Sequence, residues 1–261
     1  MTAHGSDTSL RDRITRAVCQ ALQPLPCVLA GWEGGSVAFG ATDEYSDIDL
    51  NFLVDDAASL DELYSASEVA IGRVSPIAVV HTEPPGRYYK LRDGGDFFLV
   101  DLCFFRSGAS TRSLDPERHG QVRRLFDKGE WLNGGDAEAL SAEERRRKRL
   151  EELEAWFAVS QTFVWKAVHR GQQIEALAAF WGYTLRPLVE LIRMRYCPAR
   201  WDFGMRYLCR DLPSPVYQSL RDIMFVKEPA DLPDHLTKAI EWGERLLQEH
   251  RAGSRSASSG Q

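Results

Sequence analysis

The residues best suited to chemistry lie within residues 31–54, where a glycine-rich turn precedes two closely spaced aspartates. The turn, Gly34-Gly35-Ser36, directly follows an apolar segment. Glycines let the backbone turn tightly and approach a ligand closely, and successive backbone N–H groups beside a serine hydroxyl can hold an anion. The turn therefore predicts an anion cradle, although Gly-Gly-Ser is also common in ordinary loops.

The two aspartates, Asp47 and Asp49, flank Ile48 at the start of an apolar segment typical of a strand. Residues i and i+2 of a strand point to the same face, with Cα atoms about 6.6–6.8 Å apart. Two such carboxylates repel each other, and they can bracket a pair of divalent cations about 3.5–4 Å apart. The pattern favours a metal site; the alternative is a polar strand end or an Asx turn.

A third acid, Asp101, interrupts the apolar run of residues 97–105. A run this apolar is typical of a mostly buried strand. An ionised carboxylate is costly there unless it is paired, hydrogen-bonded or metal-bound. We expect Asp101 on the sheet face that carries Asp47 and Asp49; the alternative is a salt bridge to an arginine.

The elements that must position these acids change in character along the chain. Apolar runs with turn signals predict strands over residues 27–30, 48–54, 77–81 and 97–105. Helical spacing predicts helices over residues 8–23 and 60–73. Beyond residue 140 long helices are expected, starting with a capping box at Ser141 and Glu144 and continuing over 173–196, 203–211, 214–226 and 232–250. The fold class is therefore α+β: a mixed-sheet domain with flanking helices (1–138), an all-helical domain (139–251) and a disordered tail (252–261).

Composition and charge exclude several classes of protein. The 261 residues are 44% hydrophobic and 27% charged, as in soluble globular proteins, and no apolar run approaches the roughly 20 residues of a membrane helix. With a polar N-terminus, a cytoplasmic protein without membrane contact is expected. The five cysteines form no Cys-x-x-Cys pair, so neither a zinc site nor a disulfide framework is indicated.

The charge is divided unevenly. Residues 1–140 contain 22 Asp and Glu against 13 Lys and Arg. This excess argues against salt-driven nucleic-acid binding and suits divalent metals or a cationic small substrate; the alternative is an acidic surface without a binding role. The basic run at residues 145–149 is interleaved with glutamates, which favours a solvated helix face; an RNA-binding patch is the alternative.

These motifs together resemble a known superfamily. Gly35-Ser36, then ten residues, then Asp47-Ile48-Asp49 and a distant strand aspartate resemble the nucleotidyltransferases of DNA polymerase β type. Within it, Ser46-Asp47-Ile48-Asp49-Leu50 is similar to the Ser-Asp-aromatic/apolar-Asp-Leu segment of aminoglycoside 6-adenylyltransferases. Asp93-Gly94 followed by Val100-Asp101-Leu102 resembles their Asp-Gly…Ile-Asp-Leu hairpin, with a longer spacer.

The resemblance continues more loosely into the helical half. Lys166 and Arg170 match a Lys-x-x-x-Arg helix of that family. The chain departs from the family at Gly204-Met205, where the family has Gly-Lys.

The resemblance implies an enzyme that moves AMP from ATP to a hydroxyl of a small molecule, with an aminoglycoside-like antibiotic as the expected acceptor, and releases pyrophosphate. It implies Mg²⁺, with two ions expected, as the cofactor. Asp47 and Asp49 would be the metal ligands, and Asp101 would be a third ligand or the general base for the acceptor hydroxyl.

The same resemblance supplies nucleotide-binding residues. Gly35 and Ser36 would cradle the β- and γ-phosphates, and Lys166 and Arg170, on one face of a helix, would reach the triphosphate from the helical domain.

Two other functions stay open from the sequence. One is a toxin-type nucleotidyltransferase that modifies tRNA or a protein, and the other is a non-catalytic binding protein that retains the fold.

Overall fold

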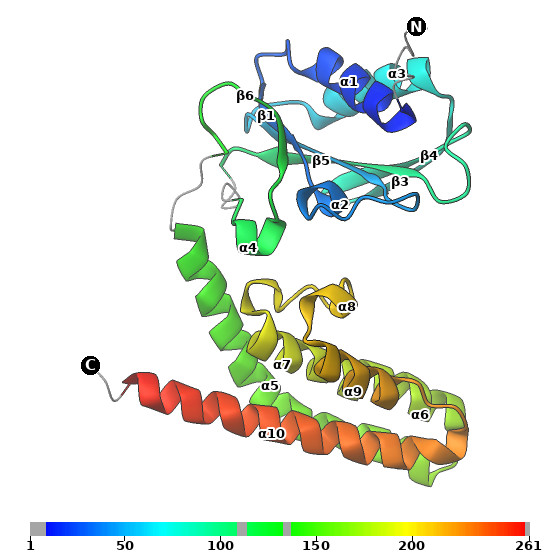
Figure 1. The fold of residues 1–261 in the computed structure, drawn as a ribbon, viewed down its shortest axis with the longest axis vertical. Coiled ribbons are helices and arrows are strands. Elements are labelled where there is room, and N and C mark those ends of the chain that lie inside the picture. Colours follow the sequence, from blue (N-terminus) through cyan, green and yellow to red (C-terminus); the bar gives the residue numbers. More distant parts are fainter. Residues whose placement is uncertain (1–8, 109–113, 133–136, 259–261) are drawn as a thin grey trace, which may run out of the picture. The chain divides into compact units, whose positions relative to one another are not determined.

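The computed structural model describes residues 9–108, 114–132 and 137–258 (Figure 1). The chain divides into two compact units, Met1–Ala139 and Leu140–Gln261; the expected boundary follows residue 138. The first unit contains a sheet with helices, and the second contains helices without a sheet among its described residues (Figure 1). The α+β class expected from the sequence is confirmed.

The first unit is built on a six-stranded mixed sheet in the order β3-β4-β5-β2-β1-β6. The central strands β2 and β5 pair in parallel, and all other neighbours pair antiparallel. The strands are β1 (Val28–Glu33), β2 (Ile48–Val54), β3 (Ile77–Glu83), β4 (Gly86–Leu91), β5 (Leu99–Arg106) and β6 (Arg123–Asp127). Strands β4 and β6 are additional to those expected, because their charged residues obscure an apolar alternation.

Two helices, α1 (Leu10–Leu22) and α3 (Leu60–Val74), pack against one face of this sheet (Figure 1). Each begins after a serine N-cap, Ser9 or Ser59, whose hydroxyl accepts a hydrogen bond from a first-turn N–H. Alternate residues of β2 and β5 fill the core beneath them: Ile48, Leu50, Phe52, Val100, Leu102 and Phe104. Because side chains alternate along a strand, Asp49 and Asp101 point to the opposite face of the sheet.

The described residues of the first unit also form two single-turn helices. These are α2 (Gly35–Ala38), directly after β1, and α4 (Pro116–His119), before β6. The cis peptide bond Pro84-Pro85 joins β3 to β4.

The second unit has its own hydrophobic core, to which its long helices all contribute. Helix α10 packs tightly against α5 at Gly243, where a Cβ would lie 2.4 Å from the Phe157 ring. Its elements are α5 (Ala137–His169), α6 (Gln173–Ala179), the π-helix η1 (Phe180–Leu185), α7 (Arg186–Tyr196), η2 (Pro198–Arg200), α8 (Leu208–Asp211), α9 (Ser214–Met224), η3 (Pro229–Asp231) and α10 (Leu232–Ser258). In the described part of the chain, no helix has the length and apolarity needed to cross a bilayer.

The helix expected over residues 173–196 contains a π-helical turn in its middle. Pro187 has no N–H, so the carbonyl of Tyr183 lacks its usual helical donor. Two side chains of α5 donate to it instead, Ser160 Oγ at 3.2 Å and Gln161 Nε2 at 3.1 Å. A proline thus explains both the irregular turn and the buried polar side chains that face it.

The helix expected over residues 203–211 is shortened to its C-terminal turn, α8 (Leu208–Asp211). Gly204 and Tyr207 both have positive φ, at 58°, which a continuous right-handed helix cannot contain. The fully buried Arg193 holds this turn by donating to the carbonyls of Gly204, at 2.8 Å, and Arg206. Its guanidinium also pairs with Asp211 at 2.9 Å.

Two further expectations are corrected. The capping box at Ser141 does not start a helix, because α5 begins at Ala137. The tail expected to be disordered from residue 252 is helical as far as Ser258, because α10 continues to that residue; residues 259–261 lie outside the described part.

Candidate functional site

The parallel pairing of β2 with β5 brings two of the expected acids together. Asp49 and Asp101 are direct partners in the ladder, and both project from the face that α1 and α3 leave uncovered. Asp47 precedes β2, and its Oδ1 accepts a hydrogen bond from the N–H of Leu99, at the start of β5, at 3.2 Å. The three acids therefore lie at the same end of the two central strands.

The three carboxylates act on one another electrostatically. Burial raises the pKa of Asp49 to about 6, and the charges of Asp101 and Asp47 contribute to this rise while Arg11 opposes it. Burial also raises the pKa of Asp101. A hydrogen bond from Cys103 opposes this rise, and the charge of Asp47 adds to it. The pKa of Asp47 is raised by burial despite the Leu99 N–H and the charges of Arg11 and Lys90.

The glycine turn packs directly against Asp49. The N–H of Gly34 donates to the carbonyl of Asp49 at 2.9 Å. Gly35 has a φ of +56°, and a Cβ on it would lie 1.8 Å from Asp49 Oδ2, so conformation and space both require glycine. Next to it, the buried Ser36 Oγ has no hydrogen-bond partner among the described residues. An unpaired buried hydroxyl beside a glycine turn suits the anion cradle that the sequence predicts.

The donor chemistry of the site suits a hard divalent cation, because carboxylate oxygens are the ligands Mg²⁺ prefers. In the described ranges, however, no group of three or more His, Cys, Asp or Glu side chains is arranged to hold a metal ion. Hydrogen-bond donors of the protein engage two of the three carboxylates: the Leu99 N–H binds Asp47, and Cys103 Sγ lies 3.5 Å from Asp101 Oδ1. The carboxylates fit the ion chemically, and full three-ligand coordination is not preformed.

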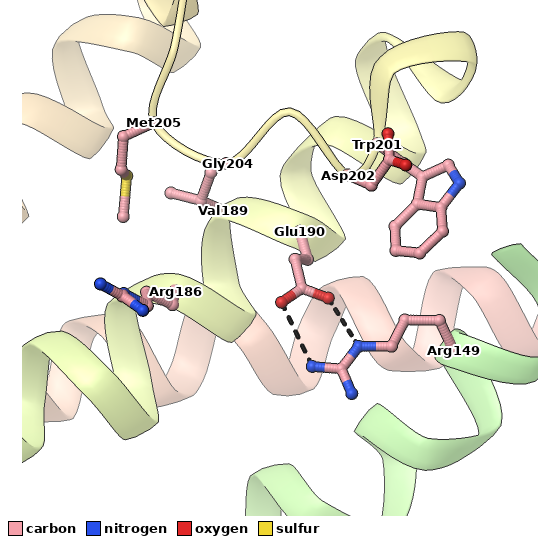
Figure 2. A pocket seen from close by; sticks show the side chains of 8 residues that line it. All are labelled: Arg149, Arg186, Val189, Glu190, Trp201, Asp202, Gly204 and Met205. Carbon is pink, nitrogen blue, oxygen red and sulfur yellow. Dashed lines mark hydrogen bonds and ion pairs between the residues drawn. The ribbon is translucent and has the colours of Figure 1, made fainter. Parts of the chain in front are cut away.

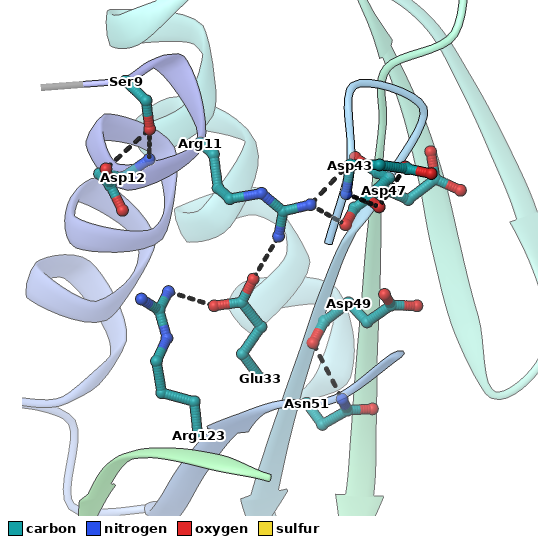
Figure 3. Close-up of polar contacts among 10 residues, drawn as sticks. Ser9, Arg11, Asp12, Glu33, Asp43, Asp47, Asp49, Asn51 and Arg123 are labelled. Atoms are coloured by element: carbon teal, nitrogen blue, oxygen red, sulfur yellow. Dashed lines mark hydrogen bonds and ion pairs between the residues drawn. The ribbon is translucent and has the colours of Figure 1, made fainter. Parts of the chain in front are cut away.

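A charge network centred on one buried carboxylate adjoins these acids (Figure 3). Glu33, at the end of β1, has no solvent exposure. One of its carboxylate oxygens accepts from Arg11 of α1 at 2.5 Å, and the other accepts from Arg123 of β6. Arg11 also donates to the carbonyls of Ser46, at 2.9 Å, and Asp47. The network thus ties α1, β1 and β6 to the backbone that enters β2.

Sequence reasoning missed this network, although a signal was present. Glu33 ends a strand whose other residues are almost all buried, and a buried carboxylate requires a cationic partner. The sequence does not reveal which cations pair with Glu33, because Arg11 and Arg123 are distant from it in sequence and belong to different elements.

Lys166 and Arg170, the expected nucleotide-binding cations, belong to the second unit. Lys166 lies in the last turn of α5, and Arg170 directly follows that helix. Both are exposed, and neither forms an ion pair within the part of the chain that the structure describes. Their part in nucleotide binding stays a prediction.

The second unit also contains a cavity of about 540 Å³, a volume typical of small-molecule sites (Figure 2). Arg149 and Glu190 both line it and are joined to each other in a two-pronged ion pair, at 2.7 and 3.2 Å (Figure 2). Its lining residues are Arg149, Arg186, Val189, Glu190, Trp201, Asp202, Gly204 and Met205. The Gly204-Met205 turn, where the chain departs from the Gly-Lys of the family it resembles, therefore lines a cavity.

Comparisons with known proteins give structural similarities only. A scan against protein-family models finds no match, and a search of curated proteins finds none either. Among solved structures, an aminoglycoside 6-adenyltransferase from Bacillus subtilis is similar, with a TM-score of 0.39 and 12% identity over 92% of this chain and 89% of that one. The spectinomycin adenyltransferase AAD(9) from Enterococcus faecialis is similar at a TM-score of 0.39 and 9% identity, over 91% of this chain and 98% of that one.

A third similar structure is a cyclic dinucleotide synthase from Elizabethkingia meningoseptica, with a TM-score of 0.29 and 14% identity over 90% of this chain and 89% of that one. At these TM-scores the similarities do not by themselves assign an activity.

The buried network predicts a large effect of Glu33→Gln on stability. The substitution removes the charge that compensates Arg11 and Arg123, so we expect the free energy of unfolding to fall by about 3 kcal/mol. Urea denaturation followed by circular dichroism measures the change. Glu143→Gln is the matched control, because Glu143 is 62% exposed in its pair with Arg146, and we expect it to cost less than about 1 kcal/mol. Equal effects of the two substitutions would contradict a structural role for Glu33.

The raised pKa of Asp49 predicts a pH-dependent gain from Asp49→Asn. In the folded protein this carboxyl has a pKa of about 6, against 3.8 for an unperturbed aspartate. Ionisation therefore lowers stability as pH rises from about 4 to above 6, and asparagine, which cannot ionise, avoids this loss. In buffer containing EDTA, we expect the variant to be more stable than wild type by on the order of 1–2 kcal/mol at pH 7.5, and not at pH 4. A gain that does not change with pH would show that Asp49 does not titrate as described.

Proposed function

We propose that this chain is a metal-dependent nucleotidyltransferase that moves AMP from ATP to a hydroxyl of a small molecule and releases pyrophosphate. The observation that carries the proposal is the pairing of Asp49 with Asp101 across β2 and β5, with Asp47 at the same end of the strands. Clustered carboxylates beside a turn with an unpaired buried serine hydroxyl suit a site for a metal-bound triphosphate.

In this reaction the acceptor hydroxyl attacks the α-phosphorus in line with the departing pyrophosphate. Asp47 and Asp49 would hold Mg²⁺, with Asp101 as a further ligand or as the base that takes the hydroxyl proton. Bound Mg²⁺ supplies Lewis-acid chemistry, lowering the pKa of the attacking hydroxyl and stabilising the leaving oxygens. The raised pKa of Asp101 brings it closer to the range in which a carboxylate accepts a proton effectively.

The remaining roles concern positioning of the triphosphate. The unpaired hydroxyl of Ser36 and the backbone at Gly35 would bind the β- and γ-phosphates. Lys166 and Arg170 would neutralise phosphate charge, and the helical unit would contribute to binding of nucleotide and acceptor. Both cations are exposed and without an ion pair among the described residues, so neither is committed to a structural role.

The acceptor is proposed to be a small, cationic, hydroxylated compound of the aminoglycoside kind. The acidic first half of the sequence favours a cation over a polyanion such as tRNA. The basic run at residues 145–149 does not offset this, because Arg146, Arg147 and Arg149 are paired with glutamates. The tRNA-modifying alternative therefore gains no support from this helix.

Transfer of label from ATP labelled at its α-phosphate tests the proposal. With Mg²⁺ and separate panels of aminoglycosides, lincosamides and bulk tRNA, we expect wild type to label a small molecule. Asp47→Asn and Asp49→Asn should reduce transfer to background, because each removes a metal-binding charge while the fold is retained. Circular dichroism checks folding. Retained turnover in both variants would remove these residues from the site, and label in tRNA would favour the toxin-type alternative.

The proposed role of Lys166 predicts a selective loss of nucleotide affinity. Lys166→Ala should weaken binding of Mg²⁺·ATP about tenfold, since one charge-assisted contact to phosphate is lost, and should affect acceptor binding less. Isothermal titration calorimetry with a non-hydrolysable ATP analogue measures this. Lys148→Ala, at another exposed lysine of α5, is the matched control and should leave the affinity unchanged. An unchanged affinity in Lys166→Ala would exclude Lys166 from the nucleotide site.

A further inference from the structure

Two exposed aromatic side chains touch each other beside the proposed catalytic acids. Tyr45 is 58% exposed and Phe97 is 65% exposed, and their ring centroids are 5.3 Å apart in an edge-to-face arrangement. Tyr45 lies two residues before Asp47, and Phe97 lies two residues before Leu99, whose N–H binds the Asp47 carboxylate. The aromatic pair therefore stands at the end of the strands where the acids meet.

The loops that carry the two rings are held by short-range hydrogen bonds. Around Tyr45, the Asp43 carboxylate accepts from the Tyr45 N–H at 3.1 Å and from the Ser46 hydroxyl at 2.7 Å, while the Asp43 N–H donates to Ser46 Oγ. Near Phe97, the Lys90 ammonium donates to the carbonyl of Asp96. Rings on such restrained loops lose little conformational freedom when a ligand binds, which favours affinity.

The charges around the pair are mainly negative. The loop before β2 carries Asp43, Glu44 and Asp47, and the loop before β5 carries Asp93 and Asp96. Three cations stand nearby: Arg92; Lys90, whose charge lowers the pKa of Asp47; and Arg11, which donates to the carbonyls of Ser46 and Asp47 and is paired with the buried Glu33. Aromatic faces attract cations, and surrounding carboxylates strengthen that attraction.

We propose that the Tyr45–Phe97 pair is the recognition surface for the acceptor, and that it selects a ring-shaped compound bearing ammonium groups. The inference rests on the function proposed above, because it places the acceptor next to the acids that would hold the nucleotide's metal. An apolar ring face of the acceptor packs on the aromatic rings, and its ammonium groups interact with the aromatic faces and with the loop carboxylates. Tyr45 and Phe97 are then specificity-determining residues.

A nucleobase is the other ligand that would stack on such rings. A base carries no positive charge that would be attracted to the acidic residues of these two loops, so the charge distribution favours the cationic acceptor. The two assignments differ in which ligand loses affinity when an aromatic ring is removed.

The test uses variants that keep an apolar side chain and remove only the aromatic face. Tyr45→Leu and Phe97→Leu are compared with Tyr45→Phe, which retains a ring, and with Phe225→Leu, the same change at a Phe that is 70% exposed in the second unit. Calorimetry on the full chain, with Mg²⁺ and a non-hydrolysable ATP analogue, measures binding of kanamycin, spectinomycin and lincomycin. Kanamycin acetylated on all its amines is the uncharged probe. Circular dichroism checks the fold of each variant.

We expect wild type to bind at least one of the three cationic compounds. The two Leu variants should weaken that binding by about tenfold each, whereas Tyr45→Phe and Phe225→Leu should change it less than about twofold. Acetylated kanamycin should bind wild type more weakly than kanamycin does and should not distinguish wild type from the Leu variants.

Three results would overturn the inference: binding of none of the three compounds by wild type, equal binding by wild type and the Leu variants, or weakened binding of the ATP analogue in place of the cation. These outcomes are separate from failure of the proposed function. That failure would appear as no binding of the ATP analogue and no transfer of label by wild type, whichever aromatic residues are present.

Discussion

The buried carboxylate of Glu33 is the constraint on which the candidate site depends. A carboxylate without solvent exposure must be compensated, and Glu33 is compensated by Arg11 from α1 and Arg123 from β6. Arg11 has further N–H groups, and it donates them to the carbonyls of Ser46 and Asp47. The position of Asp47 is therefore fixed by a charge on a different strand, and the helix that carries Arg11 is tied to the site as well as to the sheet.

The second constraint is the repulsion among the three acids, which the chain itself partly relieves. From the sequence, divalent cations are the evident means of making such crowding tolerable. The structure adds protein donors, Leu99 N–H on Asp47 and the Cys103 thiol on Asp101, and the positive charge of Arg11. It also raises the pKa of Asp49 to about 6, so a proton can neutralise that carboxyl below this pH. A bound cation would replace the proton, so ion binding would be coupled to proton release.

The sequence predicted the parts of the site that depend on local spacing. Alternation predicted Asp47 and Asp49 on one face of a strand; in the structure Asp49 lies in β2 and Asp47 directly precedes it. The apolar run around Asp101 indicated its strand, β5. The sequence could not supply the register that sets Asp49 opposite Asp101, because that depends on parallel pairing of strands separated by a helix and two other strands. Nor could it supply the partners of Glu33, the π-helical turn that follows from Pro187, or the positive φ of Tyr207 that shortens a helix. Each of these depends on contacts between distant segments or on a backbone conformation that residue type does not dictate.

The sign of the charge on the sheet face that carries the three acids constrains how two different substrates could share it. A triphosphate is repelled by Asp47, Asp49 and Asp101, so it can approach closely only with cations that neutralise both partners. A cationic acceptor has no such requirement, because the same carboxylates and the acidic loops that carry Tyr45 and Phe97 attract it directly. One acidic surface would thus favour both substrates of the proposed reaction, the nucleotide through its metal and the acceptor through its own charge. Raising the ionic strength should weaken the second attraction first, since the aromatic pair and its loop carboxylates are exposed while the acids on the sheet are partly buried.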